Sequence, residues 1–311
     1  MPKKIIFPKP LKKGDKIAIV SPAGAVEENH LTETISLIEK QGYEPVLGKY
    51  TLGKYDHGYS YSGTEEERIS DLQWALDDDK ISAMWASRGG YGCQHLISKL
   101  HLKNFRKTPK WYIGYSDNTV IQSYLLKNNF ASIHGQTIKT SSFGVSEESY
   151  SKIFEILNGK LPTYSTEPHL YNKNGTAEGV LVGGNLALIY ALLGTKYRYD
   201  FRDKILFLEE IGEQFYALDR MLMSLELAGV FKSIKGMIIG GMTNMGNEKT
   251  NDNYENSFDP MAYNIISERL KQYNFPVIFG FPNGHIFDNR PLIIGAKIKM
   301  QVGEKVSVKH L

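Results

Sequence analysis

The first candidate for chemistry is Ser116, in the stretch W-Y-I-G-Y-S-D-N-T-V of residues 111–120. The bulky apolar residues 111–113 are typical of a buried strand end, and the polar residues 116–119 are typical of a helix start. A serine at such a junction is the setting of a nucleophile elbow. The sharp turn exposes the hydroxyl, and the first N–H groups of the helix face any oxyanion that forms beside it. The stretch therefore predicts a serine nucleophile.

The elbow motif G-x-S-x-G is incomplete here, because Asn118 stands where the second glycine would be. Asparagine tolerates a left-handed backbone better than most residues, so the sequence still permits the turn. The alternative is that Ser116 only caps the helix, which is the usual role of Ser, Asp and Asn at a helix start.

A serine nucleophile needs a base, usually a histidine that a carboxylate orients. His134 and His285 each stand beside a glycine in a turn after a predicted strand, and both are candidates. His95 falls within a predicted helix. Of the eight histidines, the remaining ones have polar or terminal surroundings and are predicted to lie at the surface: His30, His57, His101, His169 and His310.

The candidate carboxylate is Glu209, which directly follows the apolar run K-I-L-F-L of residues 204–208. A charged residue at the end of an apolar strand is either capped by solvent or held there for a purpose. For Glu209 and His285 alike, the alternative is a structural role, because polar residues at the edge of a core are common. Their spacing along the chain does not show that they meet.

Cys93 is a second possible nucleophile, since it lies near His95 at a predicted helix start, a position that lowers the pKa of a thiol. The alternative is a small buried residue, which is the commoner role of a free cysteine. The glycines of residues 88–92 suggest phosphate binding, but no G-K-[ST] follows them, so a nucleotide-binding loop is not expected.

The elements that position these residues alternate between strands and helices. Strands are predicted at residues 16–21, 81–87, 111–113 and 131–133, with helices between them, one of which opens with a capping box at Thr64. This order implies a parallel sheet with helices on both faces, and such sheets bind ligands at the carboxyl ends of their strands. Polar turns occupy that position at residues 21–24, 88–92, 115–118 and 134–135.

The second half of the chain has a different pattern. Residues 158–175 are rich in Gly, Pro, Asn and Lys and are predicted to form a linker. Beyond it we expect strands, helices at residues 186–193, 215–225 and 261–270, an exposed polar loop at residues 243–259 and one or two terminal hairpins. We therefore expect a domain of residues 1–157 that carries Ser116, and a smaller mixed α+β domain of residues 176–311 that carries Glu209 and His285.

Short motifs run through nearly the whole chain in one order: V-S-P-A-G (20–24), S-R-G-G-Y-G (87–92), I-G-Y-S-D-N-T (113–119), H-G (134–135), G-G-N-L (183–186), L-G-T (193–195), F-L-E-E-I-G-E (207–213) and G-H (284–285). In this order they resemble the LD-carboxypeptidase family of serine peptidases, which also includes the microcin C self-immunity peptidases. Several motifs in the right order are far more specific than any one of them.

The resemblance implies Ser116 as nucleophile, His285 as general base and Glu209 as the group that orients the base. Glu209 is preferred to Glu210 because the family acid is the first carboxylate of its L-E-[DE] motif. Ser116 can still cap its helix while it acts as nucleophile.

The resemblance also implies an oxyanion hole formed by the backbone N–H groups of Asp117 and of Gly89 or Gly90. Family members usually have proline after H-G, whereas this chain has Gln136. That difference leaves the role of residues 134–135 open and touches no catalytic position.

The implied fold is a flavodoxin-like or glutamine-amidotransferase-like parallel-sheet domain followed by the smaller α+β domain. The implied reaction removes a terminal D-alanine from a cytoplasmic muropeptide during cell-wall recycling, by hydrolysis of an L,D-amide bond. Arg88 and Asn185 are candidate donors to the carboxylates of such a substrate. One alternative is an immunity-type peptidase acting on an aminoacyl-nucleotide antibiotic, in which Tyr254 of the polar loop could stack on the nucleobase. The other is a non-catalytic binding protein of the same fold.

Composition limits the remaining possibilities. A chain of 311 residues with 41% hydrophobic residues and a net charge of +3 suits a two-domain globular protein and gives no reason to expect nucleic acid or membrane as a partner. The basic N-terminus, broken by prolines, lacks the apolar stretch of a signal peptide. A single cysteine rules out an internal disulfide and suits a reducing compartment. We therefore expect a cytoplasmic homodimer with a small peptide substrate and neither metal nor cofactor.

Overall fold

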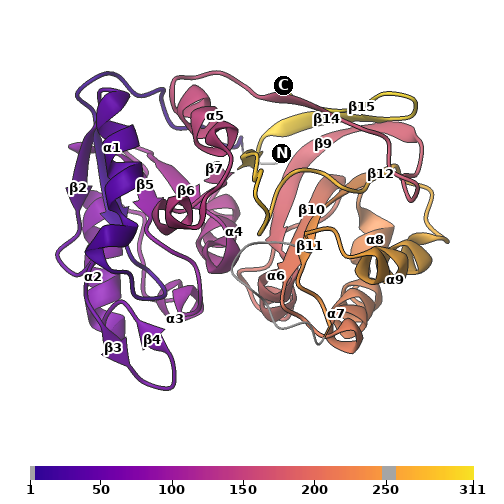
Figure 1. Ribbon diagram of the computed structural model, residues 1–311, viewed down its shortest axis with the longest axis horizontal. Coiled ribbons are helices and arrows are strands. Elements are labelled where there is room, and N and C mark those ends of the chain that lie inside the picture. The colour runs from indigo at the N-terminus through magenta and orange to yellow at the C-terminus, as the bar shows by residue number, and fades with distance from the viewer. Residues whose placement is uncertain (1–3, 247–256) are drawn as a thin grey trace. The chain divides into compact units, whose positions relative to one another are not determined.

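The computed structural model describes residues 4–246 and 257–311, apart from the side chain of Phe143. The chain forms two compact units, Met1–Lys160 (unit 1) and Leu161–Leu311 (unit 2) (Figure 1). Each unit combines helices with a buried sheet, and this confirms the expected α/β class with a parallel-sheet domain followed by a mixed one.

Unit 1 is built on parallel strands in the order β7-β6-β5-β1-β2. Most of their residues are buried, as expected of strands that helices cover on both faces. The chain proceeds from β1 to β2 on one side and then returns to β5 on the other, so the topological switch point lies at the carboxyl ends of β1 and β5, where open α/β sheets bind ligands. The strands are β1 (Lys16–Val20), β2 (Glu44–Leu47), β5 (Ile81–Ala86), β6 (Trp111–Gly114) and β7 (Ser132–His134).

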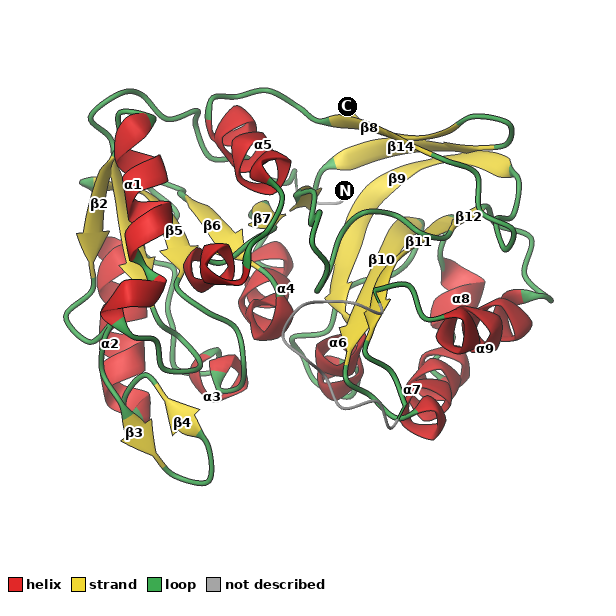
Figure 2. Ribbon diagram, in the orientation of Figure 1, coloured by secondary structure: helices red, strands yellow, loops and turns green. Residues whose placement is uncertain are grey.

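Helices flank this sheet (Figure 2). Because parallel crossovers are right-handed, α1 covers one face, while α2, α3 and α4, which pack against one another in sequence, cover the other. Trp85 of β5 packs its ring against Tyr150 and Phe154 of α5. The helices are α1 (Thr32–Lys40), α2 (Glu65–Asp77), α3 (Cys93–Leu96), α4 (Thr119–Lys127) and α5 (Glu147–Leu157), with 3₁₀ turns η1 (Glu28–His30), η2 (Ser116–Asn118) and η3 (Ile138–Phe143).

Local sequence signals account for several of these elements. The capping box before α2 is present, since Thr64 Oγ1 accepts the N–H of Glu67 and the Glu67 carboxylate accepts the N–H of Thr64. The predicted helix that begins near Cys93 and contains His95 is short and ends at Leu96. A small hairpin, β3 (Tyr55–Asp56) and β4 (Ser60–Tyr61), was not among the predicted elements.

Unit 2 contains a mixed sheet in the order β12-β11-β10-β9-β14-β15-β8. Strands β9 to β12 are parallel, whereas β14, β15 and β8 join them in antiparallel pairs, which include the expected terminal hairpin. The strands of this sheet are β8 (Thr163–Thr166), β9 (Gly175–Asn185), β10 (Lys204–Ile211), β11 (Gly236–Thr243), β12 (Val277–Ile278), β14 (Lys297–Val302) and β15 (Val306–His310). Unit 2 also contains the short strand β13 (Leu292–Ile294), which is not part of this sheet.

The segment predicted as a linker, residues 158–175, is partly a strand. Residues 163–166 form β8, which pairs with β15 and places Tyr164 opposite Val308. Tyr164 is buried and its hydroxyl donates to the carbonyl of Pro291 at 2.8 Å. Because a four-residue edge strand buries only one of its side chains fully, its sequence gives a weak signal.

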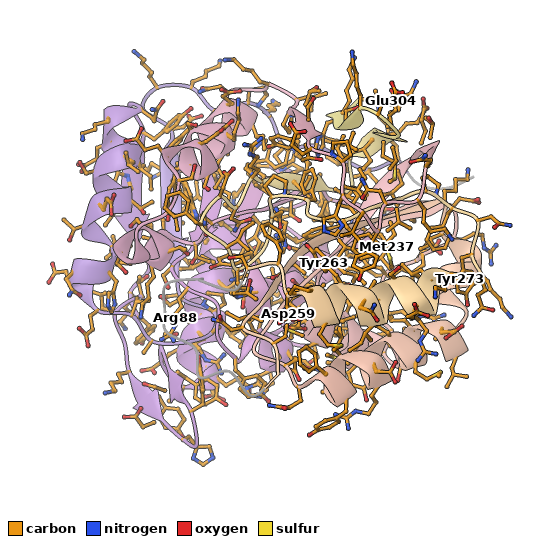
Figure 3. All side chains as sticks on the ribbon, turned by 45° about the vertical axis from the view of Figure 1, so that its right-hand side comes forward. Arg88, Met237, Asp259, Tyr263, Tyr273 and Glu304 are labelled. Carbon is orange, nitrogen blue, oxygen red and sulfur yellow. The ribbon has the colours of Figure 1, made fainter. Side chains whose placement is uncertain are left out.

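The helices of unit 2 are α6 (Leu186–Leu192), α7 (Phe215–Leu227), α8 (Val230–Ser233) and α9 (Pro260–Leu270). Tyr263 of α9, labelled in Figure 3, is buried and its hydroxyl donates to the carbonyl of Gly240 in β11 at 2.8 Å. Most of the predicted polar loop, including Tyr254, lies outside the described residues. No helix in residues 4–246 or 257–311 combines the length and the apolar character needed to cross a bilayer.

Candidate active site

Ser116 begins η2, separated from the end of strand β6 by one residue, and η2 continues directly into α4. Its φ of +63° lies in the left-handed region, which costs a non-glycine residue about 1–2 kcal/mol. The N-cap positions of η2 and α4 are Tyr115 and Asn118, and no side chain caps either helix. The interpretation of Ser116 as only a capping residue is therefore wrong, and the strained turn is the geometry of a nucleophile elbow.

Asn118 does not supply the left-handed backbone that its place in the motif suggested. Its φ of −64° is right-handed, and the left-handed residue of the turn is Ser116 itself. The buried Asn118 carboxamide instead accepts the hydroxyl of Tyr112 and donates to the carbonyls of Tyr115 at 3.0 Å and Arg88 at 3.3 Å. Asn118 therefore stabilises the turn through its side chain.

The glycine loop, residues 88–92, follows β5, the neighbour of β6 in the sheet. A Cβ atom added to Gly89 would lie 2.7 Å from Ser116 Cβ and 3.0 Å from Ser116 Oγ. Only glycine permits this approach, because real Cβ atoms do not come so close to other heavy atoms. The structure thus brings Ser116, Asp117 and Gly89 together at the carboxyl end of the parallel sheet.

Asp117 is 1% exposed, and its Oδ2 accepts the backbone N–H of Cys93 at 2.7 Å. Burial raises the pKa of Asp117 above its usual value, and the hydrogen bonds from Cys93 partly offset this. Burial, with the nearby Asp117 charge, raises the pKa of the Cys93 thiol well above its usual range. A buried protonated thiol is not an activated nucleophile, so the cysteine hypothesis is wrong.

Two further candidates of unit 1 have partners within it. Arg88, labelled in Figure 3, is half-buried and donates through Nη1 to the carbonyl of Ala25 at 2.9 Å. His134 is fully buried at the end of β7, with Nδ1 3.3 Å from Gln122 Oε1. Gln122 in turn donates to the carbonyl of Gly114 at 2.9 Å, so His134 belongs to a buried network that supports the end of β6.

In unit 2 the structure brings together Glu209 and His285, which are 76 residues apart in the sequence. Glu209 lies in β10 with no exposed surface, and its Oε2 is 2.7 Å from Nδ1 of His285, which is 9% exposed. A proton on Nδ1 donated to the carboxylate leaves Nε2 as the acceptor nitrogen. The pair therefore has the geometry of a general base oriented by a buried acid.

The loop that carries His285 is fixed at several points. Gly284 has a φ of +120°, and a Cβ atom added to it would lie 2.8 Å from Glu209 Cβ and 3.0 Å from Oε2. Glycine is therefore required at this position, by its backbone conformation and by the close approach of Glu209. The carbonyl of His285 accepts the Thr243 hydroxyl at 2.6 Å, which ties the loop to the end of β11.

Glu210 is a buried polar residue that sequence reasoning did not assign. Successive residues of a strand point to opposite faces, so Glu210 points away from the Glu209–His285 pair. Its carboxylate accepts the side-chain amide of Asn185 at 2.8 Å and the backbone N–H groups of Ala187 and Ile211 at 2.7 and 2.8 Å. Burial and then the charge of Glu209 raise the pKa of Glu210 to about 8, and these three donors partly offset that rise.

Asn185, the second candidate substrate donor, is 3% exposed at the start of α6. Its amide nitrogen donates to Glu210, and its oxygen accepts the backbone N–H of Leu188 at 3.3 Å. Both polar atoms of the side chain thus stabilise the helix start, which is the usual work of an N-cap asparagine.

His310 was predicted to lie at the surface, and this is wrong. It is 2% exposed in β15, its Nε2 accepts the backbone N–H of Ile293 at 3.2 Å, and its Nδ1 lies 3.0 Å from the carbonyl of Pro162. Burial lowers the pKa of His310 to about 4, which keeps the imidazole neutral. The terminal position of a residue therefore did not predict its exposure.

In the part of the chain that the structure describes, no group of three or more His, Cys, Asp or Glu side chains is arranged to hold a metal ion.

Known proteins resemble this chain over nearly its full length. The probable murein peptide carboxypeptidase of Bacillus subtilis is 31% identical over 309 residues, which cover 97% of this chain and 93% of that protein. The microcin C7 self-immunity protein MccF of Escherichia coli is 25% identical over 332 residues, which cover 95% and 93%. The crystal structure of muramoyltetrapeptide carboxypeptidase from Oxalobacter formigenes matches with a TM-score of 0.81 at 27% identity, covering 95% of this chain and 98% of that one.

Two family models also match. The LD-carboxypeptidase N-terminal domain matches residues 17–135, which include Ser116. The LD-carboxypeptidase C-terminal domain matches residues 178–300, which include Glu209 and His285. The chain therefore belongs to the LD-carboxypeptidase family, as its motifs implied.

Proposed function

We propose that this protein is a serine carboxypeptidase that removes the terminal D-amino acid of a muropeptide by hydrolysing an L,D-amide bond. The observation that carries the proposal is the strained left-handed Ser116, packed on Gly89, in a chain of the LD-carboxypeptidase family. The name of the Bacillus subtilis relative and that of the Oxalobacter formigenes structure support the muropeptide substrate.

In the proposed mechanism, Ser116 Oγ attacks the amide carbonyl while Nε2 of His285 accepts its proton. Glu209 stabilises the imidazolium through the hydrogen bond to Nδ1. His285 then gives the proton to the leaving amine, the C–N bond breaks, and an acyl-enzyme ester remains on Ser116. Water hydrolyses the ester by the same proton relay and frees the enzyme. The mechanism requires Ser116 Oγ and His285 Nε2 to come within hydrogen-bonding reach.

The negative charge of the tetrahedral intermediate needs donors beside Ser116. We propose the backbone N–H of Asp117 and that of Gly89 or Gly90, because Gly89 contacts Ser116 and Asp117 follows it in a helical turn whose first N–H groups have no acceptor inside the helix. For the carboxylates of the substrate we propose Arg88, which lies at the start of the glycine loop. Asn185 is the weaker candidate, since its amide already holds the start of α6.

The test is mass analysis of a murein tetrapeptide before and after incubation with the protein. We expect the tetrapeptide to lose one terminal D-alanine. Ser116→Ala should lower the rate of hydrolysis on the order of 10⁶-fold if Ser116, His285 and Glu209 act as a unit. A fluorophosphonate should also form a covalent adduct at Ser116, which would exclude a non-catalytic binding protein. Normal hydrolysis by Ser116→Ala would falsify the assignment of the nucleophile.

A second candidate function is cleavage of an aminoacyl-nucleotide antibiotic, favoured by the similarity to the microcin C7 self-immunity protein. The same assay with an aminoacyl sulfamoyl adenylate in place of the tetrapeptide separates the two. Cleavage of the adenylate without release of D-alanine from the tetrapeptide would favour the immunity role. The cytoplasmic location and the homodimer expected from the sequence stay predictions.

A further inference from the structure

Two consecutive side chains of the serine turn hold the two ends of the glycine loop. Asn118 Nδ2 donates to the carbonyl of Arg88, where the loop begins, at 3.3 Å. Asp117 Oδ2 accepts the N–H of Cys93, directly after the loop ends, at 2.7 Å. Both side chains are buried, so solvent does not compete for these hydrogen bonds.

The loop between these two points needs such support. It contains three glycines in five residues, and Gly90 and Gly92 have φ values of +105° and +135°. A glycine-rich segment has many accessible conformations, and holding it in one of them is costly in entropy. Gly89, in the same segment, must nevertheless stay in contact with Ser116. Hydrogen bonds at both ends restrict the loop to that conformation.

Arg68 of α2 holds the loop from another side. It is 3% exposed and donates to the carbonyls of Gly92 at 3.0 Å and Pro22 at 2.8 Å. The backbone N–H of Gly24 also donates to the carbonyl of Gly89, at 3.1 Å. The loop is therefore held by α2, by the turn after β1 and by the serine turn, and the bonds from the serine turn connect it to the residues that follow Ser116.

We propose that Asp117 and Asn118 are positioning residues that hold the glycine loop on Ser116 and so preform the oxyanion hole. The inference rests on the proposed function, because it assigns the N–H groups of this loop and of Asp117 to the stabilisation of the tetrahedral intermediate. Such donors act only if they are already in place when the charge develops. Loosening the loop therefore lowers the rate of reaction and leaves substrate binding nearly unchanged.

The central experiment compares Asp117→Ala with Asp117→Asn. The alanine variant loses the acceptor for the Cys93 N–H, and we expect kcat to fall about 10²-fold, the loss typical of one oxyanion donor, with KM within about threefold. The asparagine variant keeps an acceptor oxygen and should stay within about tenfold of the wild type. An Asp117→Asn variant as slow as Asp117→Ala would overturn the positioning role in favour of a role for the charge.

The matched control is Asp71→Ala in the same unit. Asp71 is also buried, and its Oδ2 also accepts a backbone N–H, that of Tyr50, at 2.7 Å. Both alanine variants should lose similar thermal stability, but only Asp117→Ala should lose kcat. Equal, small losses of kcat in the two variants would show that Asp117 has only a structural role and would overturn the positioning role.

The rate of fluorophosphonate labelling of Ser116 provides a readout that does not depend on the peptide substrate. The phosphonyl oxygen occupies the oxyanion hole during this reaction, so Asp117→Ala should label about 10²-fold more slowly than the wild type. A wild type that is not labelled would overturn the proposed function. If the wild type is labelled and Asp117→Ala is labelled at the same rate, only the positioning role is overturned.

Asn118→Ala keeps the test decisive where Asp117→Ala does not fold. This variant removes the donor to the carbonyl of Arg88, at the other end of the glycine loop, and leaves the bond from Cys93 to Asp117 in place. It should also slow the labelling of Ser116. Labelling of Asn118→Ala at the rate of the wild type would contradict the positioning role.

Discussion

The serine turn of unit 1 is held by backbone geometry, whereas the Glu209–His285 pair of unit 2 is held by burial and charge. Ser116 adopts a left-handed conformation in contact with Gly89, and the Asn118 carboxamide fixes the turn by donating to the carbonyl of Tyr115. Glu209 has no exposed surface, and its neighbour Glu210 is a buried acid with a pKa raised to about 8. The serine turn therefore carries an unfavourable backbone conformation, whereas the Glu209–His285 site carries the unfavourable free energy of removing charged groups from water.

Both regions nevertheless use glycine in the same way. Gly89 lets the chain approach Ser116, and Gly284 lets it approach Glu209, at distances that no other residue permits. A substitution in the serine turn should therefore change the geometry of the reaction with little effect of pH. A substitution around Glu209 should change the protonation of the Glu209–His285 pair and hence the pH dependence of the reaction rate.

The largest expected effect tests whether the two regions serve one reaction. Ser116→Ala and His285→Ala should each lower kcat on the order of 10⁶-fold, because members of a catalytic unit are strongly non-additive. The double variant should be no slower than either single one. Steady-state hydrolysis of the tetrapeptide by the three variants provides the measurement. If the loss of kcat in the double variant equals the product of the two single losses, the residues act independently.

The next effect concerns Glu209 alone. Glu209→Gln keeps the size of the side chain but removes the charge that stabilises a protonated His285, and kcat should fall about 10⁴-fold, as for the corresponding change in a serine protease triad. The pH–rate profile of the variant should also differ from that of the wild type, because the carboxylate no longer stabilises the imidazolium. Less than tenfold loss would show that burial of Glu209 is structural.

A smaller loss is expected for Gly89→Ala. The new Cβ atom would lie 2.7 Å from Ser116 Cβ, so the loop or the serine must move, and kcat should fall about 10²–10³-fold through displacement of an oxyanion donor. Gly194→Ala is the control, because a Cβ atom there meets no heavy atom within 4 Å. Equal activity of the two variants would contradict the close approach at Ser116.

The smallest effect is on stability and differs in sign between two buried groups of unit 2. The pKa of Glu210 is about 8 in the folded protein against 4.5 for an exposed glutamate, so its contribution to stability is lost as the pH rises from about 4.5 to about 8. At about 1.4 kcal/mol per pKa unit, the free energy of unfolding should fall by a few kcal/mol over this pH range. Glu210→Gln should remove this fall, as measured by urea unfolding at pH values on both sides of the window.

His310 provides the opposite sign. Its pKa is about 4 in the folded protein against 6.5 when exposed, so its contribution is lost as the pH falls from about 6.5 to about 4. Protonation of Nε2 would remove the acceptor for the Ile293 N–H. His310→Gln should flatten the acid side of the same unfolding curves. An unchanged acid side would show that another group dominates there.

Local patterns in the chain were sufficient for the elements on which the site rests. Thr64 and Glu67 formed their capping box because both partners lie within one helical turn. The apolar run before Ser116 and the polar residues after it placed a strand, a turn and a helix in that order, since each signal involves neighbouring residues. The family motifs then pointed to Glu209 and His285, although neither has a local signature of catalysis.

Contacts between distant residues were decided only by the folded chain. Asp117 meets Cys93 across 24 residues, Asn185 meets Glu210 across 25, and His285 meets Glu209 across 76. The burial of His310 likewise depends on β8, a strand too short to be recognised in the sequence. Spacing along a chain specifies which face of a helix or strand a residue occupies, but packing determines what that face meets, and burial and charge at the point of contact then set each pKa.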